Sequence, residues 1–592
     1  MMIEATLKAA IAKALQELYQ INISQNEVLI DYTKPDFEGD YTYVVFPIVK
    51  QSRKSPDITA NEIGSYIIQN CSAVENFNVI KGFLNISIKN NIWVEFLSQN
   101  FLNTQLGFAE PNTKEKFLIE YSSPNTNKPL HLGHIRNILL GYSVAEILKA
   151  NGHEVFTCNL VNDRGIHICK SMYAWVKSGK TETPENSGIK GDHLVGKYYV
   201  AFDAMYKNEI AELTDKGLSK EEAEKQAPCM LAAQEMLRKW EQGDNEVLEI
   251  WKTMNGWVYD GFTQTYKKLN VNFDKYYYES NTYILGKEIV NQGLEKNVFY
   301  TKPDGSVWVD LTNDGLDEKL LLRADGTSVY ITQDLGTAEL KYQDFNCNRS
   351  VYVVGNEQDY HFKVLQLICK KLQKPYADGI FHLSYGMVEL PHGKMKSREG
   401  TVVDADDLIA EMEQTAAVTT QQLGKTEGFT EIELQQLYNT IGMGALKYFI
   451  LKVDPKKKML FNPEESIDFH GNTGPFIQYT YARIRSILRQ QMPEPSINQN
   501  NISLNKFEKE LLVQTYKYQK ALQEAAVNYS PGVLCNYVFD LAKSYNQFYH
   551  ECPILREQNL DIKNLRLTLC CITSNIIKSA FGLLGINVPE KM

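Results

Sequence analysis

The sequence predicts an α/β fold in which a parallel sheet is split by a helical insertion and flanked by an N-terminal α+β domain and a C-terminal all-α bundle. Two strand-to-helix units predict the sheet. A short apolar strand at 116–121 leads through a glycine-containing turn into an amphipathic helix, and a second strand follows at 154–160. Between residues 177 and 262 the composition changes to long, charged, helix-forming segments, which indicates the insertion. Together these patterns are typical of a Rossmann-type domain.

The length of 592 residues exceeds the size at which a single core keeps growing, so we expect three or more domains. We predict an N-terminal domain over 1–110, a parallel-sheet domain over 111–465 and a helical domain over 466–592. In the first domain the pattern predicts a helix at the N-terminus, strands at 28–32 and 42–46, a helix at 60–71 and a strand at 83–88.

Sheet signals return after the predicted insertion. Apolar segments at 306–311, 328–331, 350–354 and 381–387 are predicted as strands, and a helix is predicted at 361–372. After about residue 406 the chain is predicted to be almost entirely helical. The parallel sheet is therefore expected to form from two halves on either side of the insertion.

Composition excludes several classes of protein. The formal charge of 62 − 72 = −10 argues against indiscriminate coating of nucleic acid, although a local basic surface on an acidic protein is compatible with it. The ten cysteines contain no C-x-x-C pair and are typical of reduced cytoplasmic thiols, so we expect no structural zinc. No apolar run approaches the roughly 18 to 20 residues that span a bilayer. We therefore expect no membrane partner.

A pair of histidines marks the turn after the first strand of the sheet. His131 and His134 are separated only by Leu132 and Gly133, at the start of a predicted helix. Free amide groups and the positive dipole end of a helix favour an anion, so the turn predicts a phosphate site. The spacing does not fit a zinc-binding helix pair, which needs histidines four residues apart. The alternative is a chance loop with surface histidines.

A lysine-rich segment follows 394 − 134 = 260 positions later. The stretch 391–403, PHGKMKSREGTVV, places Lys394, Lys396 and Arg398 between two glycines. Several cations on such a loop can neutralise the charge that develops on a polyphosphate. The alternative is an ordinary charged surface loop.

Together the two segments resemble the signature motifs of class I aminoacyl-tRNA synthetases, with 131–134 as the HIGH element and 394–398 as the KMSKS element. The longer wording SSPNTNKPLHLGHIRN is similar to that of arginyl-tRNA synthetases, as are segments at 400–408, 472–475, 548–550 and 588–592. This resemblance covers essentially the whole chain. It implies a monomeric cytoplasmic enzyme that uses ATP, accompanied by Mg²⁺, to activate L-arginine to arginyl-adenylate and transfers arginine to tRNA(Arg).

The resemblance also implies which residues form the site. Phosphate and transition-state contacts fall on His131, His134, Lys128, Lys394, Lys396 and Arg398, and further ATP contacts on Gly133, Met387 and Val388. Arginine contacts fall on Glu120, Asn125, Tyr330, Asp334 and Gln358; carboxylates among them suit a planar guanidinium. Contacts with tRNA fall on Phe83 and Asn85 in the first domain and on Tyr479 and Arg483 in the last. No residue is expected to ligate a metal.

Alternatives stand beside these assignments. Glu120 has the structural alternative of an ordinary strand-end partner, and Phe83, Tyr479 and Arg483 that of core packing. Two further classes of function also fit the motifs: a small-substrate nucleotidyltransferase with a HIGH-type fold, and a non-catalytic RNA-binding relative. The first would leave the outer domains without a role, and the intact histidines and lysines argue against the second.

Two departures from the family pattern leave questions open. Arginyl-tRNA synthetases often lack the second lysine of the lysine loop, with a lysine in the place of Lys128 standing in, but this chain has both Lys128 and Lys396. The sequence therefore leaves open which cation is dominant in catalysis. Residues 164–167 read Arg-Gly-Ile-His where many members carry a Trp-Gly-x-Gln pattern, which leaves one wall of the substrate pocket open.

Overall fold

A computed structural model describes residues 2–34, 36–389, 403–424, 428–495 and 503–592. The chain forms two compact units. Unit 1 comprises residues 1–104, 487–516 and 543–575, and unit 2 comprises residues 105–486, 517–542 and 576–592. The predicted borders at 110 and 465 remain predictions. Within the described residues, no helix has the length and apolar character required to cross a membrane.

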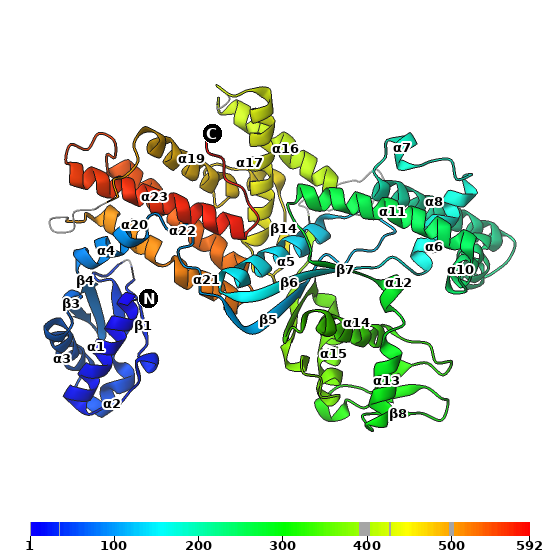
Figure 1. Cartoon of the computed structure of the whole chain (residues 1–592), viewed down its shortest axis with the longest axis horizontal. Helices are drawn as coiled ribbons and strands as arrows, with labels where there is room; N and C mark the ends of the chain where they lie inside the picture. Colours follow the sequence, from blue (N-terminus) through cyan, green and yellow to red (C-terminus); the bar gives the residue numbers. More distant parts are fainter. Residues whose placement is uncertain (1, 35, 390–402, 425–427, 496–502) are drawn as a thin grey trace. The chain divides into compact units, whose positions relative to one another are not determined.

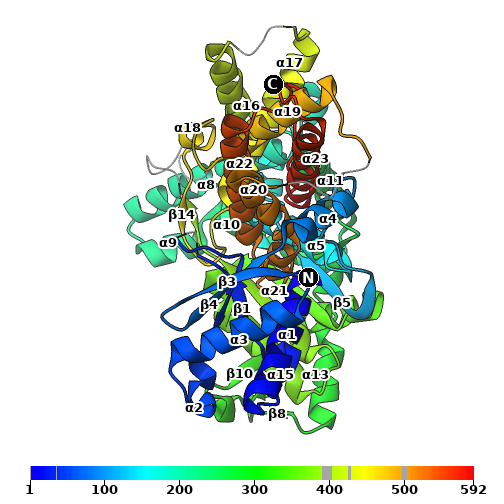
Figure 2. The same ribbon diagram turned by 90° about the vertical axis from the view of Figure 1, so that its left-hand side faces the viewer.

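Unit 1 contains an antiparallel sheet with the strand order β1-β2-β4-β3. Helices α1 and α3 pack against each other, and α3 covers β3 and β4 (Figure 2). One face of α1 is buried, with Leu7, Ile11 and Leu15 fully enclosed. The elements are α1 (Met2–Tyr19), β1 (Ile30–Tyr32), β2 (Tyr41–Val44), α2 (Val49–Ser52), α3 (Pro56–Asn70), β3 (Val74–Ile80), β4 (Phe83–Ile88) and α4 (Asn90–Asn100).

Helices from the C-terminal part of the chain complete unit 1. Arg566 and Glu508 form a nearly fully buried ion pair of 2.8 Å between two of them. Several helices of this region have residues in both units. They are α19 (Gly474–Gln490), α22 (Pro531–Glu551) and α23 (Leu560–Leu583), while α20 (Lys506–Tyr516) lies in unit 1 and α21 (Tyr518–Val527) in unit 2.

Unit 2 is built on a five-stranded sheet whose strands all run parallel in the order β12-β11-β5-β6-β7. The order reverses between β5 and β11, which is the topological switch point where open α/β sheets bind ligands. This arrangement confirms the predicted Rossmann-type sheet. The strands are β5 (Asn112–Glu120), β6 (His153–Val161), β7 (Lys275–Tyr278), β11 (Arg349–Gly355) and β12 (Ile380–Tyr385).

Helix α5 (Leu132–Ala150) follows β5 and is apolar around most of its circumference. Such a helix belongs in a core, and α5 contacts β6, α17 and α21. At Gly141 an added Cβ would lie 2.3 Å from the ring of Tyr121, so the glycine allows the helix to approach the end of β5 closely. The helix that carries the histidine turn is thereby fixed against the sheet.

The helical insertion separates β6 from β7 and is confirmed as helical, with wider limits than predicted. Helices α6, α8, α10 and α11 pack together, as Figure 1 shows. They are α6 (Ile166–Lys177), α7 (Pro184–Ser187), α8 (Gly191–Asp215), α9 (Lys220–Gln226), α10 (Pro228–Glu241) and α11 (Asn245–Lys268).

A second, antiparallel sheet of order β10-β9-β8 follows, packed with helices around its own apolar cluster. The strand predicted at 306–311 is β9 of this small sheet and does not join the parallel sheet. The elements here are α12 (Glu279–Thr282), α13 (Gly286–Glu295), β8 (Phe299–Thr301), β9 (Val307–Val309), β10 (Lys319–Leu322), α14 (Tyr330–Phe345) and α15 (Asp359–Lys371).

The strand predicted at 328–331 is wrong, because α14 begins at Tyr330. Ile331 of this segment is buried in the apolar cluster beside the small sheet. A four-residue apolar run does not distinguish a strand from the buried face of a helix. The sequence reasoning also missed β3 and β7. In β3 apolar and polar residues do not alternate regularly, and β7 contains three consecutive tyrosines. The remaining elements are β13 (Val388–Glu389), α16 (Ala405–Gln422), α17 (Glu431–Leu451), β14 (Met459–Leu460) and α18 (Pro463–Ser466).

Candidate active site

The candidate site lies at the carboxyl ends of the parallel strands. Strand β5 ends at Glu120, β6 is followed by Asn162, β7 by Glu279 and β11 by Gln358. Because parallel strands share one carboxyl edge, side chains that follow them gather at the switch point. Among the residues predicted from sequence, Glu120, Asn125, Lys128, the histidine turn and Gln358 end or follow one of these strands.

The two histidines cap the first turn of α5. His131 is the N-cap, and its Nδ1 accepts the Gly133 N–H at 3.1 Å, while the His131 N–H donates to Nδ1 of His134 at 3.1 Å. The ring centroids are 3.8 Å apart. Because both Nδ1 atoms accept, the proton of each neutral ring lies on Nε2. The turn therefore carries two Nε2–H donors at the positive end of a helix, although the amide groups that the sequence predicted to be free are paired, with Gly133 N–H bound to His131 and Leu132 N–H to the Val403 carbonyl.

Electrostatics keep both rings neutral. Burial, with the charge of Lys128, lowers the pKa of His131 to about 4. Burial also holds the pKa of His134 well below its usual value, and the neighbouring His131 and Lys128 add to the effect. The pKa of Lys128 is itself lowered by burial. A positive group and two neutral donors suit an incoming anion.

Two buried residues on α5, which sequence reasoning missed, fix this turn to the strands around it. Arg136 is fully buried and donates to the carbonyl groups of Pro455 at 3.0 Å and Lys457 at 2.9 Å. Asn137 accepts the Ser122 N–H at 2.6 Å and donates to the Val353 carbonyl at 2.6 Å. The sequence HIRN at 134–137 could have indicated them. An arginine and an asparagine on an otherwise apolar helix need hydrogen-bond partners inside the protein.

Asn137 also stabilises an unusual backbone at the end of β5. Ser122 and Ser123 both have positive φ, 76° and 44°. Residues other than glycine adopt this conformation only when surrounding contacts fix it, and such positions gather at functional sites. The Ser123 N–H donates to Asn159 at 3.1 Å, which provides the second contact.

Glu120 has a partner inside the chain. Its carboxylate forms a buried ion pair with Lys341 on α14 and lies near the Cys158 thiol. This contact matches the structural alternative weighed for Glu120, a strand-end partner. The role in arginine binding stays a prediction.

A cavity of about 460 Å³ opens at Lys128, three residues before the histidine turn. Three predicted residues line it, Asn125, Lys128 and Tyr330. Arg164 and His167, from the 164–167 wall that the sequence left open, also line it, whereas sequence reasoning missed Asn127, Asn162, Tyr199 and Glu279. Their common signal is that they follow the carboxyl ends of β5, β6 and β7 or lie on the first helices of the insertion.

Glu279 is the carboxylate of this cavity. Burial, together with the charges of Asp163 and Asp334, raises its pKa against the opposing effect of Arg164. Arg164 is already engaged, because it pairs with Glu241 at 2.9 Å and stacks on Tyr283. Negative charge at the cavity wall is therefore available to a cationic ligand.

The remaining residues predicted to bind arginine lie around α14 and after β11. Tyr330 begins α14 and is 79% exposed, and Asp334 lies one turn further along the same helix. The Asp334 carboxylate is 2.5 Å from Nε2 of His361. Gln358 is exposed at the carboxyl end of β11.

Comparison with known families covers most of this chain. A model described as "tRNA synthetases class I (R), catalytic domain" matches residues 97–462, the "Arginyl tRNA synthetase N terminal domain" matches 5–88, and the "DALR anticodon binding domain" matches 477–592. The first alone spans more than half of the chain. The chain belongs to the arginyl-tRNA synthetase family.

Relatives within the arginyl-tRNA synthetase family match along the full length. Arginine–tRNA ligases of Amoebophilus asiaticus and Bacteroides fragilis are 54% and 55% identical, with 100% of each chain covered. Among solved structures, the arginyl-tRNA synthetase of Thermus thermophilus has the same fold, with a TM-score of 0.80 at 24% identity over 99% of both chains. The family expectation from the two motifs is confirmed.

The other predicted positions of this family member fall in different surroundings. Lys394, Lys396 and Arg398 lie outside the described residues. Met387 is half exposed, and Val388 begins β13, which pairs with β14.

The positions predicted to contact tRNA also differ among themselves. Phe83 is 42% exposed beside Phe46, whereas Asn85 is buried and donates to Asn78 at 2.9 Å. Arg483 stacks on Tyr479 along one face of α19, and both are partly buried.

Proposed function

We propose that this chain is an arginine–tRNA ligase that activates L-arginine with ATP and transfers the arginyl group to tRNA(Arg). The observation that carries the proposal is the neutral, Nδ1-accepting histidine pair at a helix N-terminus, together with Lys128, which lowers the pKa of His131 and lines a cavity with a carboxylate wall. One end of this arrangement suits phosphate and the other suits a cationic side chain.

In the first step the arginine carboxylate attacks the α-phosphorus of ATP, and pyrophosphate leaves. A terminal ribose hydroxyl of the tRNA then attacks the carbonyl carbon of arginyl-adenylate, and AMP leaves. Catalysis of such steps is mainly positioning and charge stabilisation. We assign His131 and His134 to the phosphates through Nε2–H, with Gly133 allowing close approach of the backbone, and we assign Lys128 to the developing negative charge.

We keep Lys394, Lys396 and Arg398 as proposed partners of the same phosphates, and Met387 and Val388 as proposed contacts of the adenosine. Mg²⁺ is proposed to arrive with ATP, as the family resemblance implies. When bound, the ion would neutralise phosphate charge. No protein ligand for it is proposed.

For arginine we propose that Glu279 and Asp334 bind the guanidinium and that Tyr330 covers it. Glu279 lines the cavity, and the charge of Asp334 reaches it. Asn125 and Gln358, at the ends of β5 and β11, are proposed for the amino-acid head group, with Glu120 behind them. This divides the cavity into an acidic end and a polar end.

For tRNA we propose Phe83 as a stacking residue, since it is exposed beside Phe46. Asn85 is proposed as a support within the sheet and Tyr479 and Arg483 as contacts of the C-terminal helices. We further propose that residues 1–110, 111–465 and 466–592 act as elbow-binding, catalytic and anticodon-binding domains, and that the enzyme is a cytoplasmic monomer.

The test is aminoacylation of total tRNA with each amino acid in turn. We expect charging with arginine alone, and arginine-dependent pyrophosphate exchange that requires tRNA, as the family resemblance implies. Charging with another amino acid, or none with arginine, would overturn the proposal. Sedimentation velocity of the full chain tests the monomer.

A further inference from the structure

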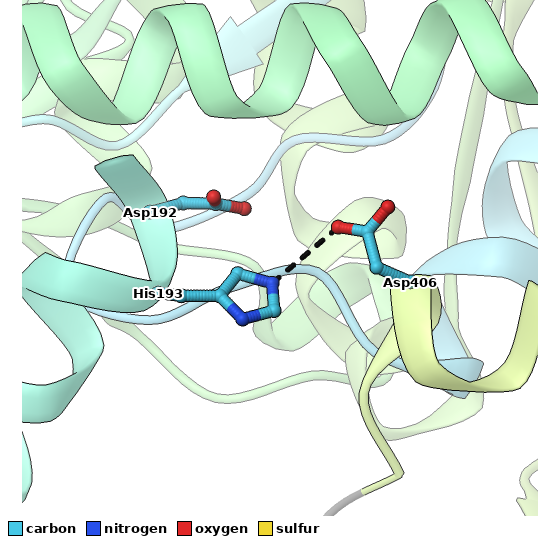
Figure 3. Close-up of side chains that lie close together, drawn as sticks. All are labelled: Asp192, His193 and Asp406. Carbon is cyan, nitrogen blue, oxygen red and sulfur yellow. Dashed lines mark ion pairs between the residues drawn. The ribbon is translucent and has the colours of Figure 1, made fainter. Parts of the chain in front are cut away.

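A group of charged side chains joins the helical insertion to the segment that directly follows residue 402. Asp192 and His193 lie in the first turn of α8, and Asp406 lies in the first turn of α16, with their ligand atoms within 4.8 Å of one another. Figure 3 shows the His193 ring directed at the Asp406 carboxylate. Both residues are partly buried, and Asp192 is fully buried.

Two lysines complete this group, and both contact Asp406. Nζ of Lys190, the N-cap of α8, lies 2.6 Å from Asp406 and 3.1 Å from Asp192. Lys268, at the C-terminal end of α11, lies 2.8 Å from the other Asp406 oxygen. His193 Nε2 is 3.4 Å away, an ion-pair contact without hydrogen-bond alignment. One carboxylate therefore connects three helices.

The composition of the group does not suit a metal ion. Lys190 already places its ammonium between Asp192 and Asp406 and supplies the positive charge. The second oxygen of Asp192 points away from the group, since a Cβ added at Gly261 of α11 would lie 2.4 Å from it. The contacts instead fix positions: α8 and α11 approach so closely at Gly191 and Gly261 that neither can shift alone.

The same stretch of chain pairs with the histidine turn. The Leu132 N–H donates to the Val403 carbonyl at 2.9 Å, and the Ala405 N–H donates to the Leu130 carbonyl at 3.0 Å. His131 and Asp404 face each other in this antiparallel bridge. Each of them is the N-cap of its own helix, α5 and α16. Any displacement at the start of α16 thus reaches His131 through two backbone hydrogen bonds.

We infer that Asp406 is a positioning residue for activation: by pairing with Lys190, Lys268 and His193 it fixes residues 403–405 as the support on which the phosphate-binding histidine turn rests. The inference deepens the proposed function and rests on it. Asp406 itself touches no proposed substrate.

The charges at the site agree with this role. Burial by itself would raise the pKa of Asp406, but His193, Lys190 and Lys268 hold it well below the usual range. Burial opposes protonation of His193, yet the carboxylates of Asp406 and Asp404 outweigh it and raise that pKa. The carboxylate stays ionised throughout the physiological range, so the support is permanent.

The test compares Asp406→Asn with Asp407→Asn in the wild-type background. Asp407 is exposed in the same helical turn and has no ion pair among the described contacts. Asp407→Asn therefore removes the same charge and leaves the Asp406 ion pairs intact. A misplaced catalytic group costs on the order of 10²-fold. In Asp406→Asn we expect kcat of tRNA-dependent pyrophosphate exchange to fall about 10- to 100-fold with KM for arginine within about twofold.

A milder pair of variants covers the case in which Asp406→Asn fails to fold. Lys268→Gln removes one half-exposed partner and is expected to lower kcat several-fold, while Lys267→Gln, its exposed neighbour, leaves kcat unchanged. We also expect a double-mutant cycle with Lys190→Gln to be non-additive. The double variant Asp406→Asn/Lys190→Gln should be about as active as the less active of the two single variants.

Three outcomes overturn the inference: unchanged kcat in both Asp406→Asn and Lys268→Gln, equal losses in the Asp407→Asn control, or losses that multiply in the cycle. Failure of the proposed function is separate, because it would show as absence of arginine charging in the wild-type enzyme.

Discussion

Glu120 and Lys341 form an ion pair in which the two side chains are only 9% and 3% exposed. Glu120 ends β5 and Lys341 lies on α14, 221 positions later. Burial alone would lower the pKa of Lys341, but the Glu120 carboxylate raises it. The pair therefore ties the central strand to the helix that carries Tyr330 and Asp334.

Replacing Lys341 with methionine should destabilise unit 2 strongly. The change leaves a buried carboxylate without a cation, which typically costs about 3–5 kcal/mol. The measurement is the shift of the guanidinium unfolding transition. Lys302→Met is the control, because its pair with Glu318 is 33% and 42% exposed and should contribute at most about 1 kcal/mol. Equal shifts for the two variants would contradict the prediction.

His134→Ala should slow activation without changing tRNA affinity. The substitution removes one preorganised donor and the contact that caps His131, and loss of such a donor costs roughly 10²- to 10³-fold in rate. Single-turnover formation of arginyl-adenylate with tRNA present gives the rate, and filter binding gives the affinity. A parallel loss of tRNA binding would indicate misfolding instead. His470→Ala, at an 88% exposed histidine, is the control.

Stability should fall as the pH drops from about 6.5 towards 4. The pKa of His131 is lowered from 6.5 to about 4, so in this range the unfolded chain binds a proton that the folded chain excludes. The stabilisation is complete above pH 6.5 and is lost through this window. Thermal melts of wild type and His131→Asn at several pH values test the idea; asparagine keeps an N-cap. We expect a shallower slope in the variant, and identical slopes would refute the assignment.

Glu279→Gln should weaken arginine binding and leave ATP binding intact. The substitution keeps the size of the side chain and removes the charge that faces the cavity. A hydrogen bond to a charged partner contributes about 1.5–3 kcal/mol, so Kd for arginine should rise roughly 10- to 100-fold. Calorimetry with each ligand separates the two. Glu288→Gln on α13, outside the cavity, provides the matched control.

Asp334→Asn should act on the same ligand. Its carboxylate contacts His361, and its negative charge acts on Glu279. Arginine binding is therefore again expected to weaken about 10- to 100-fold, with ATP binding little changed. Equal weakening of arginine and ATP would place Asp334 outside the arginine pocket.

Much of the site was predictable because the residues that carry it are close in sequence. The histidine turn is a local strand-turn-helix feature, so Gly133 and the helix N-terminus could be recognised directly. Lys341 and Glu279 could not, since Lys341 reaches the site from α14 and Glu279 from the end of β7. The misplaced strand at 328–331 has the same cause, because a four-residue apolar run does not distinguish a strand from the buried face of a helix.

The sequence by itself determined the parallel sheet, the insertion, the family and the phosphate-binding turn, because each depends on periodicity or on a short motif. Only the tertiary structure decided which carboxylates are available. It gives Glu120 a buried lysine, directs Glu279 to the cavity and commits Asp406 to three cations. The physical reason is that the availability of a charge depends on its neighbours in space, and folding brings those neighbours from elements far apart in the chain.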